Sequence, residues 1–220
     1  MGNRHISLPG QKNYEYAHEF AYRLACEQLA KIDDIEQQCG KGGAQYQVTG
    51  SKKVITLEYL NQSYLITLPD IEISLTESEE KVPIRDKILI LHYFIQARGT
   101  PSSNKLITYK ELPGGNSYFP TFTKRTIKPI LKNFGKEPRL LVEAAEGLGG
   151  DKADYGDVAV TINAFSRVPI TLVLWQGDEE FTPEASIIFD ANISDYLSTE
   201  DVTVVCETIT WRLIRYLRET

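Results

Sequence analysis

Four short segments rich in β-branched and aromatic residues follow one another in the first half of the chain. They are Gln45 to Val48, Lys53 to Tyr59, Tyr64 to Leu68 and Ile71 to Leu75. The residues between them are typical of tight turns, and they are Gly50-Ser51, Asn61-Gln62 and Pro69-Asp70. Connections this short cannot carry the crossover that a parallel pair of strands needs. The segments are therefore predicted to form an antiparallel meander over about residues 44–76.

Helical patterns precede the meander. Tyr14 to Ile32 repeats apolar residues at steps of three and four, which predicts a helix with one buried face. The stretch Gly40 to Gly43 is rich in glycine and contains a lysine, but it lacks the preceding strand and the Lys-Ser/Thr ending of a phosphate-binding P-loop. We expect it to be a flexible connection between helix and strand.

The central third is predicted to be mainly helical. Pro83 to Gly99 is apolar nearly all round, which favours a buried helix, although its high β propensity leaves a strand as the alternative. A basic amphipathic helix is expected over Phe122 to Phe134, interrupted near Pro129, because proline lacks the N–H that a helix interior requires. Pro138 to Gly147 predicts a shorter helix, and Gly149 to Asp157 a mobile loop.

The last third returns to strands and closes with a helix. Strands are predicted over Val158 to Phe165, Ile170 to Trp175 and Ala185 to Asp190, and a helix opens at Ser198 with a capping hydroxyl. The expected fold class is α+β, with antiparallel sheet packed against several helices in a single domain over residues 1–220. Its parts are an N-terminal helix, the meander, central helices over about 82–147, and C-terminal strands and helix over about 157–219.

Composition limits the class of protein. The chain has 220 residues, of which 42% are hydrophobic, so it has ample material for a globular core. A net charge of −6 argues against a general nucleic-acid binder, which needs a surplus of Lys and Arg. No apolar run is long enough to span a membrane. Three widely spaced cysteines, of which Cys39 is expected to be exposed, fit a reducing compartment, so we expect a cytoplasmic protein.

The charges are distributed unevenly. Residues 124–139 contain six basic residues and one acid, a local charge of +5, whereas residues 177–201 contain eight acids and no base. The two stretches either face each other across a cleft, gripping a small anion or zwitterion, or form separate solvated surfaces in which exposed ion pairs contribute little. A small anionic ligand suits this distribution better than nucleic acid does.

The acidic stretch holds candidates for catalysis and for metal binding. Clustered carboxylates raise one another's pKa, which suits acid–base catalysis, and their oxygens bind Mg²⁺ or Ca²⁺. The catalytic candidates are Asp178, Glu179, Glu184 and Asp190. The metal candidates are Asp178, Glu180 and Glu184. The simpler interpretation is a hairpin turn with outward-facing acids.

A glycine-rich stretch before the basic helix predicts a ligand site. Backbone N–H groups of such a loop, together with a helix N-terminus, bind anions, and neighbouring aromatic rings stack on planar molecules. The ligand-binding candidates are Gly114, Gly115, Asn116, Tyr118, Lys124, Arg125 and Trp175. The alternative is a tight turn whose aromatic side chains enter the core. Trp175, at a strand end, has packing as its simpler role.

Histidines and cysteines give no metal motif. No spacing places two of the three histidines on a common face with a carboxylate, and His92 on a buried helix is interpreted as a hydrogen-bonded core residue. The cysteines cannot supply a closely spaced set of four, so neither an intrinsic iron–sulfur cluster nor a structural zinc ion is expected.

Three stretches of the chain carry a resemblance. They are Ile84 to Tyr93, Glu111 to Gly115 with Tyr118 and Phe122, and Val173 to Asp190 followed by Tyr196 to Asp201. With these the chain, from about Tyr14 onward, resembles an uncharacterised bacterial and archaeal family catalogued only as a domain of unknown function and frequent in anaerobes. Some relatives carry an attached segment of iron–sulfur type, which implies a role near redox or corrinoid chemistry.

Three functions follow as hypotheses. The first is an accessory domain that binds a small anionic or planar molecule or cofactor. The second is an acid–base or divalent-metal-assisted enzyme that uses the acidic hairpin. The third is a protein-interaction module of a redox or corrinoid-related assembly.

Overall fold

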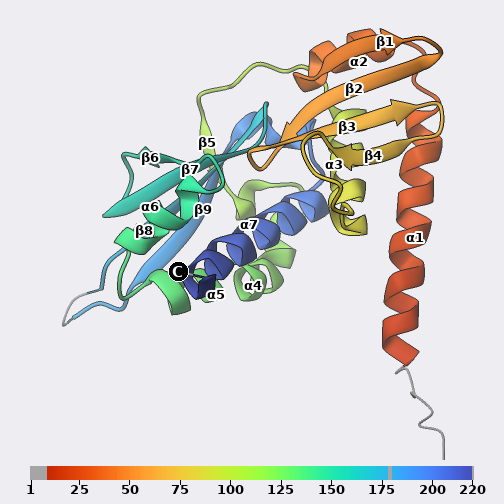
Figure 1. Cartoon of the computed structure of the whole chain (residues 1–220). Helices are drawn as coiled ribbons and strands as arrows, with labels where there is room; N and C mark the ends of the chain where they lie inside the picture. The colour runs from red at the N-terminus through yellow and green to blue at the C-terminus, as the bar shows by residue number, and fades with distance from the viewer. Residues whose placement is uncertain (1–8, 178–179, 220) are drawn as a thin grey trace, which may run out of the picture.

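The computed structural model describes residues 9–177 and 180–219, in which one sheet packs against helices (Figure 1). The helices are α1 (Pro9–Leu29), α2 (Ile35–Gly42), α3 (Ile84–Gln96), α4 (Gly115–Arg125), α5 (Ile127–Phe134), α6 (Arg139–Glu146) and α7 (Thr199–Glu219). The strands are β1 (Gln45–Thr49), β2 (Lys52–Tyr59), β3 (Gln62–Leu68), β4 (Glu72–Leu75), β5 (Leu106–Thr108), β6 (Asp151–Ala153), β7 (Val158–Phe165), β8 (Val168–Trp175) and β9 (Glu184–Asp190). The α+β class is confirmed.

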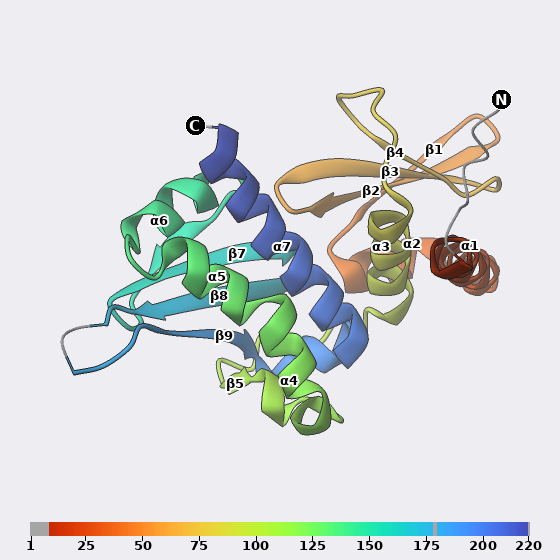
Figure 2. The ribbon, with the colours of Figure 1, turned by 90° about the horizontal axis from the view of Figure 1, so that it is seen from below.

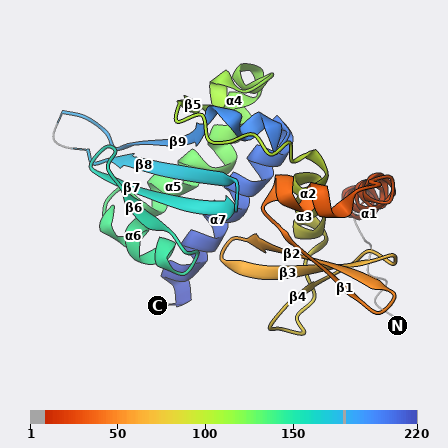
Figure 3. The same cartoon turned by 90° about the horizontal axis from the view of Figure 1, so that it is seen from above.

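The sheet consists of two halves joined at a narrow junction. The order is β4-β3-β2-β7-β8-β9-β5, with β1 on β2 and β6 on β7, and every pairing is antiparallel. The predicted meander, β1 to β4, is confirmed and forms one half. It meets the other half, β5 to β9, through the single pair Tyr59 and Phe165 and a hydrogen bond from Leu60 N to Ala164 O. The halves extend in opposite directions from this junction (Figure 3).

Helices α4 to α7 cover one face of the β7–β9 region (Figure 2). The apolar stripe predicted for the closing helix packs inward, since Val202, Val205 and Leu213 are fully buried. Helix α3 is confirmed as a helix and lies at the centre of the fold: the Tyr93 ring stacks on Phe165 at 3.9 Å between centroids, and the Tyr93 hydroxyl donates to Gly42 O. The two sheet halves and the helices therefore share one core.

Helix α1 buries only part of its predicted face. Its C-terminal half packs on α3 and buries Ala25 and Leu29, whereas Tyr14 and Leu24 are exposed. Figure 1 shows the N-terminal part of α1 standing away from the rest of the molecule.

Several local predictions were wrong. The stretch from Gly40 to Gly43 is no flexible connection: it forms the end of α2, which Gly43 terminates in the left-handed conformation at φ 63°. Cys39 lies on the inner side of that short helix and is buried instead of exposed. The interruption expected in the helix over 122–134 is present, but it lies at Thr126, between α4 and α5, and not at Pro129, because Pro129 lies in the first turn of α5, where no N–H is needed. The predicted mobile loop after α6 contains β6.

Candidate functional site

The described acids of the acidic hairpin, Glu180, Glu184 and Asp190, do not assemble as one cluster. Asp178 and Glu179 lie outside the described residues, Glu180 precedes β9, and Glu184 opens β9 on the surface. Asp190 lies at the opposite end of that strand and is buried. In the ranges 9–177 and 180–219, no group of three His, Cys, Asp or Glu side chains is placed to hold a metal ion.

Asp190 holds the loop between α3 and β5. Its carboxylate accepts hydrogen bonds from Ser102 Oγ at 2.6 Å, from Ser103 Oγ at 2.7 Å and from backbone N–H groups of Ser103, Asn104 and Asn192. Burial alone would raise the pKa of Asp190, but these donors outweigh it and hold the pKa below its usual range. A carboxylate saturated in this way stabilises structure and has no lone pair left for proton transfer.

The glycine-rich stretch is a helix start instead of a loop. Gly114 adopts the left-handed conformation at φ 71° and caps α4, so Asn116 and Tyr118 lie on the exposed first turns of that helix. Gly115 is buried against the preceding turn, where an added Cβ would collide with the carbonyl oxygen of Tyr109. Both glycines are therefore needed for a tight turn, which the sequence analysis gives as the alternative to a ligand-binding loop.

The variant Gly115→Ala is expected to lower the free energy of unfolding by about 2–3 kcal/mol, because the new methyl group must displace backbone. Gly40→Ala is the matched control. It lies on the exposed side of α2, where an added Cβ would have no heavy atom within 4 Å, and it should stabilise the helix by roughly 0.5–1 kcal/mol. Urea unfolding measures both. Equal free energies for the two variants would contradict the close approach at Gly115.

The basic stretch is mostly a solvated surface. Lys124, Lys128, Lys132, Lys136 and Arg139 are exposed, and Trp175 is 42% exposed at the end of β8. Arg125 differs because it points into the fold and binds Glu207 of α7 through two hydrogen bonds, Nε to Oε1 at 3.1 Å and Nη2 to Oε2 at 2.6 Å. Of the predicted ligand-binding residues, Arg125 is the one that lies in a charged cavity.

A ladder of ion pairs joins α3 to α7, and we call it the seam. Its pairs are His92 with Asp201 at 2.8 Å, Arg85 with Glu207 at 2.6 Å, and Asp86 with Arg212 at 3.3 Å. His92, near the C-terminal end of α3, pairs with Asp201 in the first turn of α7, whereas Arg85 and Asp86, at the start of α3, pair further along α7, so the helices run antiparallel where they meet. A spacing of seven residues places Arg85 and His92 on the same side of α3, two turns apart. One cavity lies at each end of the seam.

The first cavity, the His92 cavity, has a volume of about 430 Å³ and lies among α1, α3, α4 and the start of α7. His92 Nδ1 donates to Asp201 Oδ1, and Ser198 Oγ donates to Asp201 Oδ2 at 2.6 Å. The hydrogen bond to Asp201 raises the pKa of His92, and this outweighs the lowering effect of burial. Arg85 and Arg125 complete the charged wall.

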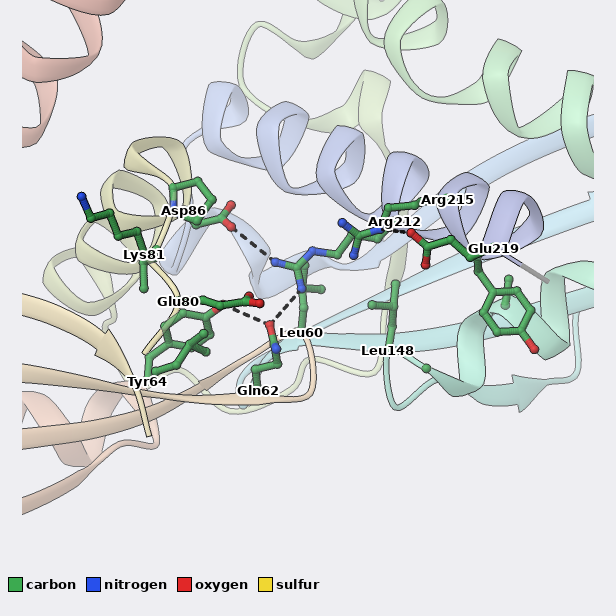
Figure 4. Close-up of a pocket in the computed structure, with 16 residues that line it drawn as sticks. Leu60, Gln62, Tyr64, Glu80, Lys81, Asp86, Leu148, Arg212, Arg215 and Glu219 are labelled. Carbon is green, nitrogen blue, oxygen red and sulfur yellow. Dashed lines mark hydrogen bonds and ion pairs between the residues drawn. The ribbon is translucent and has the colours of Figure 1, made fainter. Parts of the chain in front are cut away.

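The second cavity, the Arg212 cavity, has a volume of about 450 Å³. Figure 4 shows the Arg212 guanidinium between Asp86 and Gln62. The Tyr59 hydroxyl donates to Asp86, and burial raises the pKa of Asp86 above its usual value. A depression at Trp211 lies between the two cavities. It shares Arg85 with the His92 cavity, and it shares Asp86 and Arg212 with the Arg212 cavity.

Sequence reasoning did not find the seam. His92 and Asp201 are 109 residues apart, and Arg85 and Glu207 are 122 apart, so no local motif joins them. The hydrogen bond predicted for His92 is present, but His92 also lines a cavity. The sequence feature that could have indicated the seam is the seven-residue spacing of Arg85 and His92 on a largely apolar helix.

Comparison with known protein families gives a match over most of the chain. The family model described as "Domain of unknown function (DUF3786)" matches residues 34–212, which include every residue of the seam. No curated protein and no solved structure matches the chain. Among the helices of residues 9–177 and 180–219, none has the length and apolar character needed to cross a membrane.

Proposed function

The chain belongs to the family of the domain of unknown function DUF3786, and we propose that its His92 cavity binds a small organic anion with an apolar or planar body. The observation that carries the proposal is that two arginines share one carboxylate beside the cavity. Arg85 Nη2 and Arg125 Nη2 both donate to Oε2 of Glu207, each at 2.6 Å.

The net charge of the residues at the cavity wall favours an anionic ligand. Arg85 and Arg125 carry two positive charges against the single charge of Glu207, and protonated His92 balances Asp201. A guanidinium has five N–H donors, so both arginines keep donors beyond those that Glu207 occupies. The wall therefore carries one uncompensated positive charge when His92 is protonated. Glu200 adds a negative charge at the exposed rim, where it helps to raise the pKa of His92 and where solvent weakens its effect on a ligand held by the two arginines.

Most of the rest of the wall is apolar, although Tyr14, His18 and Ser198 also line the cavity. Ala17 and Ala21 of α1 face Ile88 and Leu89 of α3 across the cavity, together with Val204 of α7. An apolar wall with a few convergent polar groups is the usual composition of a small-molecule site. It favours a carboxylate with a hydrocarbon body over inorganic phosphate.

Benzoate is the probe that tests the proposal, and benzamide is its neutral isostere. Isothermal titration calorimetry is expected to show benzoate binding to the intact chain and benzamide binding at least about tenfold more weakly, the equivalent of one charged contact. Arg125→Gln should weaken benzoate binding to a similar degree. Arg139→Gln, on the exposed face of α6, is the matched control and should leave affinity unchanged.

The same measurement has a pH dependence that identifies His92. Its pKa is raised above the usual 6.5 or so, so affinity should be constant between about pH 5, where benzoate is ionised, and that pKa, and should fall, by up to about tenfold per pH unit, above it. His92→Gln should remove this dependence, whereas His18→Gln, at the other histidine that lines the cavity, should keep it. Equal binding of benzoate and benzamide, or the same pH profile in His92→Gln and the native chain, would contradict the proposal.

We propose the cellular location and the biological role that the sequence analysis predicts. Cys26, Cys39 and Cys206 are free thiols, which supports the cytoplasmic location that we propose for the binding domain. A role as an accessory or interaction module near redox or corrinoid chemistry is part of the same proposal, as is occurrence in anaerobes. An acid–base enzyme stays a prediction, now with His92 and Asp201 as the residues whose geometry supports it.

A further inference from the structure

The Arg212 cavity lies where the two halves of the sheet meet. Gln62 and Tyr64 come from the meander, Asp86 from α3, Leu148 from the turn that follows α6, and Arg212 from α7. The halves share one strand pair at this point, so the cavity occupies the junction between two structural units. Ligand sites form preferentially at such junctions, because neither unit alone fills the space between them.

Asp86, which is buried, and Arg212, which is half-buried, form a charge pair with long contacts. Asp86 is 7% exposed, and it receives Arg212 Nη2 at 3.3 Å and the Tyr59 hydroxyl at 3.3 Å. Arg212 Nη1 reaches Gln62 Oε1 at 3.4 Å. Charge-assisted hydrogen bonds between such groups are usually about 2.7–2.9 Å, and the Glu207 contacts at 2.6 Å show that close pairing is attainable in this same seam.

The length of these contacts matters because a buried ion pair stabilises a protein only when its geometry is good and its remaining donors and acceptors are satisfied. The geometry of the Asp86 and Arg212 pair is loose, since both hydrogen bonds to Asp86 are 3.3 Å long. The two charges lie side by side at the wall of a cavity, as Figure 4 shows, and the Arg212 guanidinium also lies over the Tyr59 ring at 5.5 Å from its centroid.

We infer that the Arg212 cavity binds an α-amino acid with an apolar side chain, its carboxylate on Arg212 and its ammonium on Asp86. The two charges of an α-amino acid are attached to one carbon and match two adjacent protein charges of opposite sign. A simple anion would face the carboxylate of Asp86, and a simple cation would face the guanidinium of Arg212. Leu60, Tyr64 and Leu148 line the same cavity and offer apolar contacts to the side chain. The other charged residues of the lining carry equal numbers of each sign, Glu80 and Glu219 against Lys81 and Arg215, so they favour neither a simple anion nor a simple cation. This second site is independent of the His92 cavity.

The test uses L-leucine and calorimetry on the intact chain. Leucine is expected to bind, and L-leucinamide, which lacks the carboxylate, and N-acetyl-L-leucine, which lacks the ammonium, should each bind at least about tenfold more weakly. Glycine, which lacks the apolar side chain, should also bind more weakly. These ligand comparisons use the native protein and so do not depend on the folding of any variant.

Variants of the lining residues test where leucine binds. Arg212→Met and Asp86→Asn should each weaken leucine binding by a similar factor, whereas Arg139→Met on the exposed face of α6 should not. His92→Gln should also leave leucine binding unchanged, which separates this site from the anion site. Absence of leucine binding, equal binding of leucine and N-acetyl-leucine, or full affinity in folded Arg212→Met and Asp86→Asn proteins would each overturn the inference.

Discussion

Replacing Phe165 by alanine is expected to lower the free energy of unfolding by about 3–5 kcal/mol, the usual cost of removing a buried aromatic side chain. Phe165 is 1% exposed, and its ring stacks on Tyr93 at 3.9 Å and on Tyr59 at 4.9 Å between centroids. It is also the β7 partner in the single pair that joins the halves of the sheet. The variant therefore creates a cavity and weakens the junction at the same time.

The position of Phe165 predicts where the loss appears. Hydrogen exchange should show a larger loss of protection in the meander, β1 to β4, than in β7 and β8, because the latter keep their own extensive ladder. Phe165→Leu is the control, since it keeps most of the volume and should cost less than about 1.5 kcal/mol. A uniform loss of protection across both halves would contradict a narrow junction.

Replacing Asp190 by asparagine is expected to lower the free energy of unfolding by about 2–4 kcal/mol, because hydrogen bonds to a charged acceptor are each worth more than neutral ones. The carboxylate accepts five hydrogen bonds. An amide keeps one acceptor oxygen and turns an N–H group toward donors. The loop of residues 100–104 and the edge strand β5 should lose order first.

The stabilisation by Asp190 has a definite pH window. Because the folded-state pKa of Asp190 is held below the usual value, its contribution is present above about pH 4 and is lost as the pH falls toward the folded-state pKa. Urea unfolding at several pH values should show the difference between native protein and variant shrinking below that pH. Asp195→Asn is the control: its ion-pair partner Arg98 is largely exposed, and an asparagine keeps an oxygen that accepts the hydrogen bond from Thr100 Oγ1, so the variant should cost less than about 1 kcal/mol. Equal losses of unfolding free energy in the two variants would show that the hydrogen bonds around Asp190 stabilise the fold no more than an exposed ion pair does.

Local signals predicted most of the fold. The period-two pattern and turn residues between 45 and 75 predicted β1 to β4 to within a few residues, since their pairing needs only short connections. The apolar stripe of the last helix and the capping hydroxyl of Ser198 likewise act within a few residues of each other. The predictions were wrong at two glycine-rich stretches, where the same residue type can either form a loop or mark the end of a helix. Glycine in Gly40 to Gly43 and in Gly114-Gly115 signals a break in a pattern, but only packing decides whether it ends a helix, begins one or stays in a loop.

The sequence by itself determined the fold class, the meander and the separation of basic from acidic stretches, because these depend on periodicity and on neighbours along the chain. The tertiary structure decided which charges meet. It left Lys124 and Lys128 in solvent, turned Arg125 toward Glu207, and brought His92 to Asp201, 109 positions further along the chain. Charge interactions act through space and weaken rapidly in water, so only the packing of α3 against α7 gives these residues partners. Both candidate cavities owe their chemistry to that one helix contact.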